Sequence, residues 1–230
     1  VSTPDAQNVF IAAHDGHVIK SSDMGNSWSD ISPGISDQLL EGGFDFPNNT
    51  TGYLALVDNL TDYGKLLKTS DGGMSWNEID YGFNTKLKCL SFANGNTGLI
   101  GLSNHKLLVT HDGGVSWTEC FIESPSSIKY VKMFDELTGV ATINGDYVAV
   151  TNDGGYTFET VYTGSNNWPY PVSFSYFLDE NNGWGCGSDG MIMRYYAMTT
   201  AISENKNPNP GNENLLHFYP NPSTGKIHLN

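Results

Sequence analysis

Carboxylates that recur at fixed spacing are the residues of this sequence with the clearest potential for chemistry. Asp23, Asp71, Asp112 and Asp153 lie 48, 41 and 41 residues apart, each inside a short phrase of similar composition. Repeated aspartates could bind calcium, but a calcium site needs several oxygen ligands and each phrase supplies one carboxylate. An aspartate can instead accept hydrogen bonds from the backbone N–H groups that follow it and so shape a turn. We therefore predict a structural role for these four residues and no metal site.

The phrase around each aspartate contains a glycine and ends on an aromatic residue. Its copies are Ser21–Trp28, Thr69–Trp76, Thr110–Trp117 and Thr151–Phe158. We expect the glycine two residues after each aspartate to take a positive φ, which other residues resist. These glycines are Gly25, Gly73, Gly114 and Gly155. The closing aromatic residues, Trp28, Trp76, Trp117 and Phe158, are large enough to fill the gap between neighbouring repeats.

The phrase resembles the Asp-box, or BNR repeat, with its Ser-x-Asp-x-Gly-x-Thr-Trp pattern. Self-similarity at a period of about 40–50 residues is typical of repeat architectures built from one supersecondary unit per period. Short strand patterns surround each phrase, such as Thr97–Leu102 before the third copy and Leu87–Phe92 before that. Each unit therefore reads as a meander of four short strands, which is one propeller blade.

The predicted fold is all-β: a β-propeller of four-stranded antiparallel blades, with about five blades represented. Three blades are whole, at about 41–80, 87–122 and 128–162. A leading blade lacks its first strand, and a trailing blade lacks its last. These two could complete each other in a ring of five blades, or both could belong to a larger ring of six to eight. We favour the second interpretation, in which the chain forms an incomplete ring.

The propeller is expected to occupy residues 1–196, followed by an Asn- and Pro-rich linker at 197–214. The last segment, 215–230, contains Tyr-Pro-Asn-Pro-Ser-x-Gly from Tyr219 to Gly225 and then a β-like run. It resembles the beginning of the C-terminal sorting domain of Bacteroidetes type IX secretion cargo. The resemblance implies recognition by the type IX secretion machinery, export, and an extracellular or outer-membrane surface location.

Charge and composition restrict the class of partner. The formal net charge is −14, with 25 acidic and 11 basic side chains, so binding to the phosphates of a nucleic acid is not expected. No apolar run approaches the ~18 residues of a membrane helix. Cys89, Cys120 and Cys186 have no metal-like spacing, and we expect buried free thiols, although Cys89 and Cys120 could face each other within one blade.

The residues required by two kinds of enzyme, a sialidase and a polysaccharide-active glycoside hydrolase, can be compared with those in the sequence. A sialidase needs several arginines to hold the substrate carboxylate, and this chain has the single arginine Arg194. A glycoside hydrolase needs two carboxylates across a cleft, and acidic residues such as Asp58, Asp146 and Asp189 lie in predicted loops. The histidines of His14-Asp15-Gly16-His17 could share a metal ion, but no third ligand is evident. We assign no catalytic residue and expect no metal and no other cofactor.

The overall pattern is similar to the photosystem II assembly factor-like propellers, on the Thr-Gly-aliphatic strands and the Thr-x-Asp-Gly-Gly-x-Ser/Thr-Trp phrases. The photosynthetic members use an arginine-rich face, which this acidic chain lacks. In propellers with Asp-boxes the ligand face is the one opposite the boxes. The candidate ligand residues on that face are His14, His17, Asp58, Tyr63, His105, Asp146, Trp168, Tyr170 and Asp189.

The function predicted from these features is that of a non-catalytic binding or interaction scaffold, with a glycan or a surface or extracellular protein as its partner. The alternative is an extracellular glycoside hydrolase active on polysaccharides, with its catalytic carboxylates in the loops.

Overall fold

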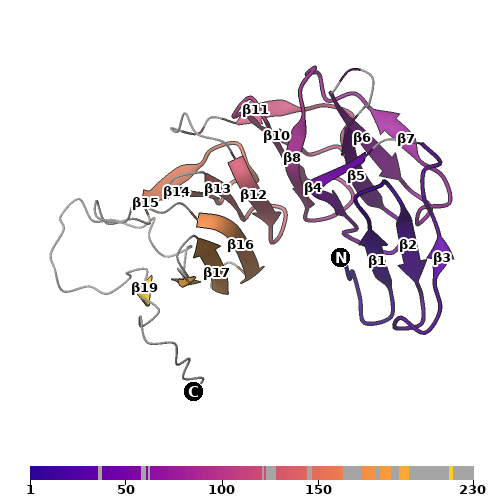
Figure 1. The fold of residues 1–230 in the computed structure, drawn as a ribbon. Helices are drawn as coiled ribbons and strands as arrows, with labels where there is room; N and C mark the ends of the chain where they lie inside the picture. Colours follow the sequence, from indigo (N-terminus) through magenta and orange to yellow (C-terminus); the bar gives the residue numbers. More distant parts are fainter. Residues whose placement is uncertain are drawn as a thin grey trace, which may run out of the picture.

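Five antiparallel sheets follow one another along the chain (Figure 1). The computed structural model describes residues 1–35, 38–57, 61, 63–120, 122, 128–143, 147–162, 172–179, 182–187, 192–196 and 218–219. All regular elements in these residues are strands, and none is a helix long and apolar enough to cross a membrane. The sheets are called blades 1 to 5 below.

Each blade is a meander in which consecutive strands pair. Blade 1 contains β1 (Val9–Ala12), β2 (Val18–Ser21) and β3 (Ser29–Asp30). Blade 2 contains β4 (Gln38–Asp45), β5 (Gly52–Val57), β6 (Gly64–Thr69) and β7 (Asn77–Ile79). Blade 3 contains β8 (Leu87–Phe92), β9 (Gly98–Leu102), β10 (Leu107–Thr110) and β11 (Thr118–Cys120). Blade 4 contains β12 (Ile128–Met133), β13 (Gly139–Ile143), β14 (Tyr147–Thr151) and β15 (Glu159–Tyr162). Blade 5 contains β16 (Val172–Asp179), β17 (Asn182–Gly187), β18 (Ile192–Tyr196) and β19 (Phe218–Tyr219).

The predicted class of all-β, four-stranded antiparallel blades is confirmed, and the structure differs from the prediction at its two ends. The sequence predicted that blade 1 lacks its first strand, but Ser2 pairs with Phe10 in that place through an isolated bridge. It also predicted that blade 5 lacks its last strand, but Phe218 and Tyr219 pair with Met193 and Ile192 of β18. Both gaps are thus filled over one or two residues. Strand patterning did not reveal them because segments this short have no periodicity.

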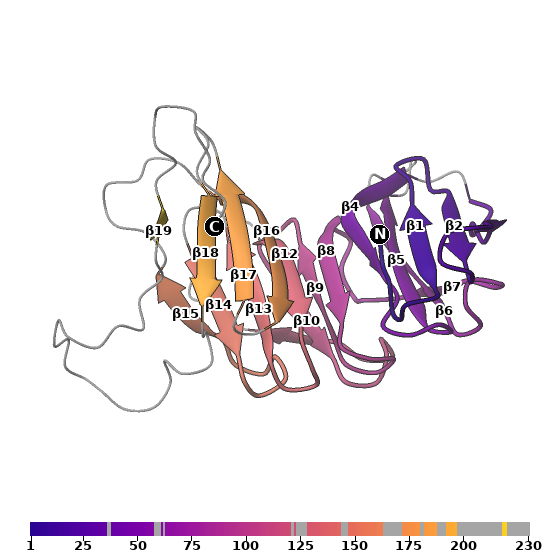
Figure 2. The same ribbon diagram turned by 90° about the horizontal axis from the view of Figure 1, so that it is seen from below.

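The five blades form an incomplete ring. Figures 1 and 2 both place blade 1 at one end of an arc and β16 and β17 of blade 5 toward the other. The innermost strands of neighbouring blades β4, β8, β12 and β16 contact one another in that order. The favoured interpretation of an incomplete ring, rather than a closed ring of five blades, agrees with this arrangement.

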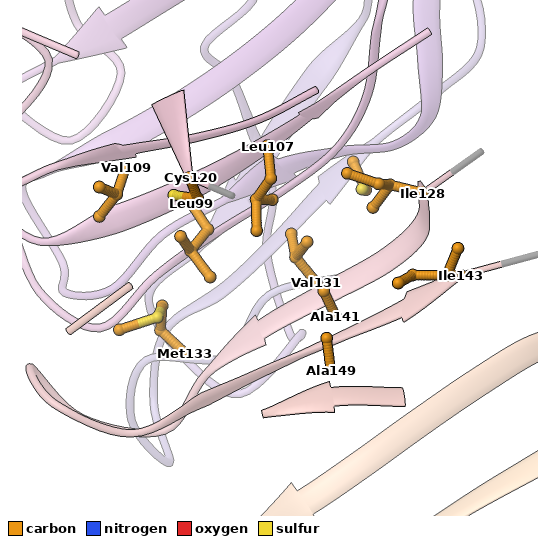
Figure 3. Close-up of a cluster of buried hydrophobic side chains, with 11 residues drawn as sticks. Leu99, Leu107, Val109, Cys120, Ile128, Val131, Met133, Ala141, Ile143 and Ala149 are labelled. Atoms are coloured by element: carbon orange, nitrogen blue, oxygen red, sulfur yellow. The ribbon is translucent and has the colours of Figure 1, made fainter. Parts of the chain in front are cut away.

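The core lies between blades rather than inside them. The second strands of blades 3 and 4, β9 and β13, are buried at every position, so both of their faces are covered. Figure 3 shows one such layer, in which Leu99, Leu107 and Val109 of blade 3 meet Val131 and Met133 of blade 4. Both faces of an interior blade are therefore apolar, and each depends on a neighbour to exclude water.

A glycine at the start of each second strand accommodates a large side chain from the first strand. Phe46 and Gly52, Phe92 and Gly98, Met133 and Gly139, and Phe177 and Gly183 are each six residues apart. A Cβ atom on Gly98 would lie 2.2 Å from Cδ1 of Phe92, and one on Gly52 would lie 2.3 Å from Cε1 of Phe46. The aromatic ring therefore rests directly on the backbone of the glycine.

That placement exposes the other face of the ring to the preceding blade. Phe46 stacks on Phe10 of blade 1 with ring centroids 3.7 Å apart, and Phe92 stacks on Tyr53 of blade 2 at 3.4 Å. One pair of aromatic residues thus joins each of these two blade interfaces.

We expect Gly98→Ala to destabilise the protein by about 1–3 kcal/mol, because the added methyl group must displace the ring of Phe92. Urea denaturation followed by fluorescence measures the change. Gly95→Ala is the matched control, since a methyl group there would lie 3.4 Å from Oγ1 of Thr51. A loss of stability of equal size in both variants would contradict this account of the glycine.

Candidate functional site

The four repeated aspartates hold four nearly identical turns, each between the third and fourth strand positions of a blade. In the second copy, Oδ1 of Asp71 accepts hydrogen bonds from the hydroxyl of Thr69 at 2.8 Å and from the backbone N–H of Ser75 at 2.9 Å. Oδ2 accepts from the hydroxyl of Ser75 at 2.6 Å. The hydroxyl of Thr69 in turn accepts from the N–H of Gly73 at 2.9 Å. Asp23, Asp112 and Asp153 make the same contacts within their own copies.

These hydrogen bonds stabilise the ionised carboxylates. Donation from the side chain of Ser75 is the largest cause that lowers the pKa of Asp71 to about 2, followed by the backbone N–H of Ser75. The pKa of Asp23 and that of Asp112 are also lowered to about 2, chiefly by donation from Ser27 and Ser116. For Asp153 the largest single effect is burial, which raises the pKa, but the hydrogen bonds from Thr157 and Thr151 together lower it below its usual value. Both oxygens of each carboxylate are therefore engaged within the protein.

The glycines of the turns have left-handed backbone conformations. The φ angles of Gly25, Gly73, Gly114 and Gly155 are 88°, 94°, 92° and 95°. The close approach to the preceding blade also favours glycine, since a Cβ atom on Gly73 would lie 2.5 Å from Cδ1 of Ile31 in blade 1. The positive φ favours glycine at all four positions, and at Gly73 the close contact favours it as well.

A second recurring turn, which sequence reasoning missed, supports the first. Asn94 Oδ1 accepts hydrogen bonds from the backbone N–H groups of Asn96 and Thr97 at 2.7 and 2.9 Å. Asp5, Asn48 and Asp135 do the same in blades 1, 2 and 4. A carbonyl of this turn then accepts from the aspartate turn of the same blade, as Asn96 does from Gly113 N–H at 2.8 Å. The signal in the sequence is an Asn or Asp four residues before the first residue of the second strand.

The aromatic residue that ends each phrase contacts the blade interface. The indole N–H of Trp76 donates to the carbonyl of Ile31 in blade 1 at 2.8 Å, and its ring packs edge-on against Phe46. Trp117 packs edge-on against Phe92 in the same way, and Phe158 packs against the cluster between blades 3 and 4. Trp28 differs, because its indole donates to Gly25 of its own turn at 3.1 Å.

The innermost strands of neighbouring blades are linked by side chains that accept hydrogen bonds from backbone N–H groups. The sequence analysis did not predict these links. Ser2 Oγ accepts from the N–H of Phe46, Asp45 Oδ2 from the N–H of Phe92, and Ser91 Oγ from the N–H of Met133, at 3.1, 2.9 and 3.1 Å. Burial raises the pKa of Asp45, and the charge of Lys132 opposes the shift. Equivalent positions thus carry Ser, Asp and Ser, and no single residue type marks them in the sequence.

The predicted ligand residues that the structure describes lie at the ends of strands opposite the aspartate turns. His14 and His17 are exposed in the turn between β1 and β2, His105 is exposed between β9 and β10, and Tyr63 is 46% exposed just before β6. His17 Nδ1 lies 3.1 Å from Asp15 Oδ2, and hydrogen bonds from His17 lower the pKa of Asp15. Asp58, Asp146, Trp168, Tyr170 and Asp189 lie outside the described residues. The role of this set in ligand binding stays a prediction.

In the part of the chain that the structure describes, no group of three or more His, Cys, Asp or Glu side chains is suited to a metal ion. Cys89 and Cys120 are buried free thiols on β8 and β11, the opposite edges of one sheet, and so do not face each other. Burial raises the pKa of each thiol to about 12. Cys186 is a free thiol as well, but it is exposed, so the expectation of burial is wrong for this residue.

Comparison with known proteins supports the fold. No family model and no curated protein matches the chain. A structure of YCF48 bound to D1 peptide is similar, with a TM-score of 0.61 and 16% identity over 84% of this chain and 62% of that chain. The GH74 enzyme of Niastella koreensis has a TM-score of 0.65 and 14% identity over 86% of this chain and 35% of its own. The GH74 xyloglucanase of Xanthomonas campestris has a TM-score of 0.65 and 13% identity over 86% of this chain and 36% of its own.

The five blades and these structural similarities define the class of protein: an all-β propeller built from four-stranded antiparallel blades. The chain spans less than two thirds of the length of each of these three similar proteins, 62%, 35% and 36%. At identities of 13–16% the likeness extends to the fold alone.

We expect Asp71→Ala to lower the urea midpoint at pH 7 and to weaken its dependence on acid. Because the pKa of folded Asp71 is about 2 and that of an unfolded aspartate is about 4, its stabilisation is present above pH ~4 and is lost as the pH falls towards 2. Urea midpoints between pH 7 and pH 2 measure this.

Glu78→Ala is the control, because Glu78 is exposed on the neighbouring strand β7. It should leave both the midpoint and its acid dependence close to those of the unmodified protein. A curve for Asp71→Ala that stays parallel to that of the unmodified protein down to pH 2 would count against a structural role for the carboxylate.

Proposed function

We propose that this propeller is a secreted or surface-displayed scaffold that binds a glycan or an extracellular protein without catalysing a reaction. The observation that carries the proposal is that the repeated carboxylates form hydrogen bonds within their own turns. The most regular acidic residues of the chain have both oxygens bonded within their own turns and a lowered pKa. A general acid in glycoside hydrolysis needs a raised pKa instead.

Among the described carboxylates, Asp45 is the one whose pKa is raised. It is therefore the first candidate for a general acid if the protein were an enzyme. It accepts a hydrogen bond from the backbone of Phe92, and its charged neighbours are Lys132 and the amino group of Val1. The hydrogen bonds to Asp45, from Phe92 and from the hydroxyl of Ser2, come from the innermost strand of the next blade and from the bridge residue of blade 1, which favours a structural role for Asp45 too.

The proposed binding surface is the face opposite the aspartate turns, around Tyr63, His14 and His105. Exposed aromatic and imidazole rings at loop ends suit stacking on sugars or contacts to a peptide. One of the similar propellers was determined with a peptide bound, and this supports protein as a partner class for the fold. The C-terminal segment at 215–230 is proposed to direct the chain to the type IX secretion machinery and so to the outside of the cell.

The glycoside hydrolase alternative is favoured by the likeness to two GH74 enzymes, one of them a xyloglucanase. In this alternative, loop acids such as Asp58, Asp146 and Asp189 would carry the reaction. The two functions differ in one measurable respect, which is the turnover of a polysaccharide.

We expect the purified chain to bind at least one ligand on an array of glycans and extracellular protein fragments, and to release no reducing sugar from polysaccharides. Tyr63→Ala should weaken binding at least tenfold. Met74→Ala is the matched control, because Met74 is an exposed side chain at the tip of an aspartate turn, on the opposite face.

Hydrolysis of a polysaccharide that is abolished by Asp58→Asn, Asp146→Asn or Asp189→Asn would overturn the scaffold function in favour of the enzyme. Binding that is lost equally in Tyr63→Ala and Met74→Ala would overturn the assignment of the face.

A further inference from the structure

Two exposed rings of neighbouring blades stack on each other on the face that carries the aspartate turns. His111 belongs to the aspartate turn of blade 3 and Tyr156 to that of blade 4. Their ring centroids lie 4.7 Å apart, with 21° between the ring planes. His111 is exposed, and Tyr156 is 61% exposed. Because His111 covers one side of the Tyr156 ring, the other side is the accessible one.

The repeat forms its aspartate turns without aromatic rings at these two positions. Ser22 and Met74 occupy them at the interface of blades 1 and 2, and Ser70 and Val115 occupy them at the interface of blades 2 and 3. The aspartates of all four turns nevertheless make the same hydrogen bonds. The turns therefore do not need the two rings in order to fold.

A hydrogen-bonded amide and carboxylate lie next to the ring pair. Nδ2 of Asn94 in blade 3 donates to Oε1 of Glu136 in blade 4 at 2.7 Å. Glu136 and His111 meet at Gly154, where a Cβ atom would lie 2.8 Å from the carbonyl oxygen of Glu136 and 3.1 Å from Cε1 of His111. Glu136 is exposed, and its second carboxylate oxygen has no hydrogen-bond partner among the described residues. Two rings, an amide and a carboxylate thus gather at one place on the surface.

The four side chains that meet here are called the ring cluster: Asn94, His111, Glu136 and Tyr156. At the interface of blades 2 and 3 a lysine occupies the corresponding place, since a Cβ atom on Gly113 would lie 2.5 Å from Nζ of Lys68. Val109 stands at the position of Lys68 in the next repeat, so a neutral side chain replaces the ammonium group. The charge of Glu136 and the net charge of −14 have the same sign, so the ring cluster disfavours an anionic ligand.

We propose that the ring cluster binds a neutral sugar residue of a glycan, at a site separate from the surface on the opposite face. The apolar C–H face of a pyranose ring stacks on the accessible side of Tyr156. Sugar hydroxyl groups donate to the second oxygen of Glu136 and accept from the remaining N–H of the Asn94 amide. His111 holds the tyrosine ring in place, so less side-chain freedom is lost on binding. The inference does not rest on the proposed function, because it uses none of the same residues.

The test is a titration of the intact chain with three neutral oligosaccharides, cellohexaose, xylohexaose and mannohexaose, followed by NMR. NMR is chosen because a site on an open surface, unlike a deep pocket, binds a ligand weakly. We expect at least one of the three to shift the ring resonances of His111 and Tyr156 in a saturable manner, and the anionic hexagalacturonate to leave them unchanged. Saturable shifts with hexagalacturonate, or none with any neutral oligosaccharide, overturn the proposal.

Variants of the ring cluster test the role of each group. Tyr156→Ala should weaken binding at least tenfold because the stacking surface is lost, whereas Tyr156→Phe keeps the ring and should bind within threefold of the unmodified protein. Glu136→Gln should weaken binding at least threefold, because an NH₂ group replaces one acceptor oxygen while the other oxygen can still accept from Asn94. Val115→Ala is the matched control and should leave binding unchanged, since Val115 is 84% exposed at the same position of the neighbouring turn.

Tyr63→Ala separates this site from the surface on the opposite face. It should leave the binding of these oligosaccharides at the ring cluster unchanged. Binding that is weakened by Tyr63→Ala and not by Tyr156→Ala would overturn the ring cluster as a site while supporting the proposed function. Binding that resists both variants, or that falls as much with Val115→Ala as with Tyr156→Ala, also overturns the ring cluster.

Discussion

The whole structure depends on burying both faces of each interior blade. β9 and β13 are apolar on both sides and buried throughout, so a single sheet of this kind could not exclude water from its own side chains. A large side chain over a glycine recurs in blades 2 to 5, as Phe92 over Gly98, and at two interfaces a ring of the preceding blade stacks on it, as Tyr53 does on Phe92. The aspartate turns set the spacing at the end of the sheet so that these contacts can form.

The aspartate turns have a structural role, and this explains why the most repetitive residues of the sequence say little about a ligand. Asp71 and its counterparts have their oxygens bonded inside the turn, and the turn itself is bonded to the neighbouring loop through Gly72 and Thr50. These carboxylates stabilise the shape of the turn and are not available to a ligand. The opposite ends of the strands carry varied residues, including Tyr63 and His105, and variation there changes the surface without disturbing the interfaces between blades.

The sequence predicts the blades well because their signals are local and repeated. The strands around Leu87–Phe92 and Gly98–Leu102 were located within about one residue, since alternating turn residues and apolar runs define them. The acceptors on the innermost strands were missed because Ser2, Asp45 and Ser91 share a position and not a residue type. The turns around Asn48 and Asn94 were missed because their signal is one Asn or Asp at a fixed distance before the second strand, and it becomes visible only when the repeats are aligned on that strand. The pairing of Phe218 and Tyr219 with β18 links segments far apart in the sequence, which no local pattern reports.

Native-state hydrogen exchange, read strand by strand in dilute solution, tests most directly whether neighbouring blades stabilise each other. β9 and β17 both occupy the second position in their sheets and pair on both edges, so their backbone hydrogen bonding is alike. They differ in that β9 is covered on both faces and β17 on one. If burial between blades stabilises the sheets, the amides of β9 should exchange at least tenfold more slowly than those of β17. Equal protection of the two strands would contradict it.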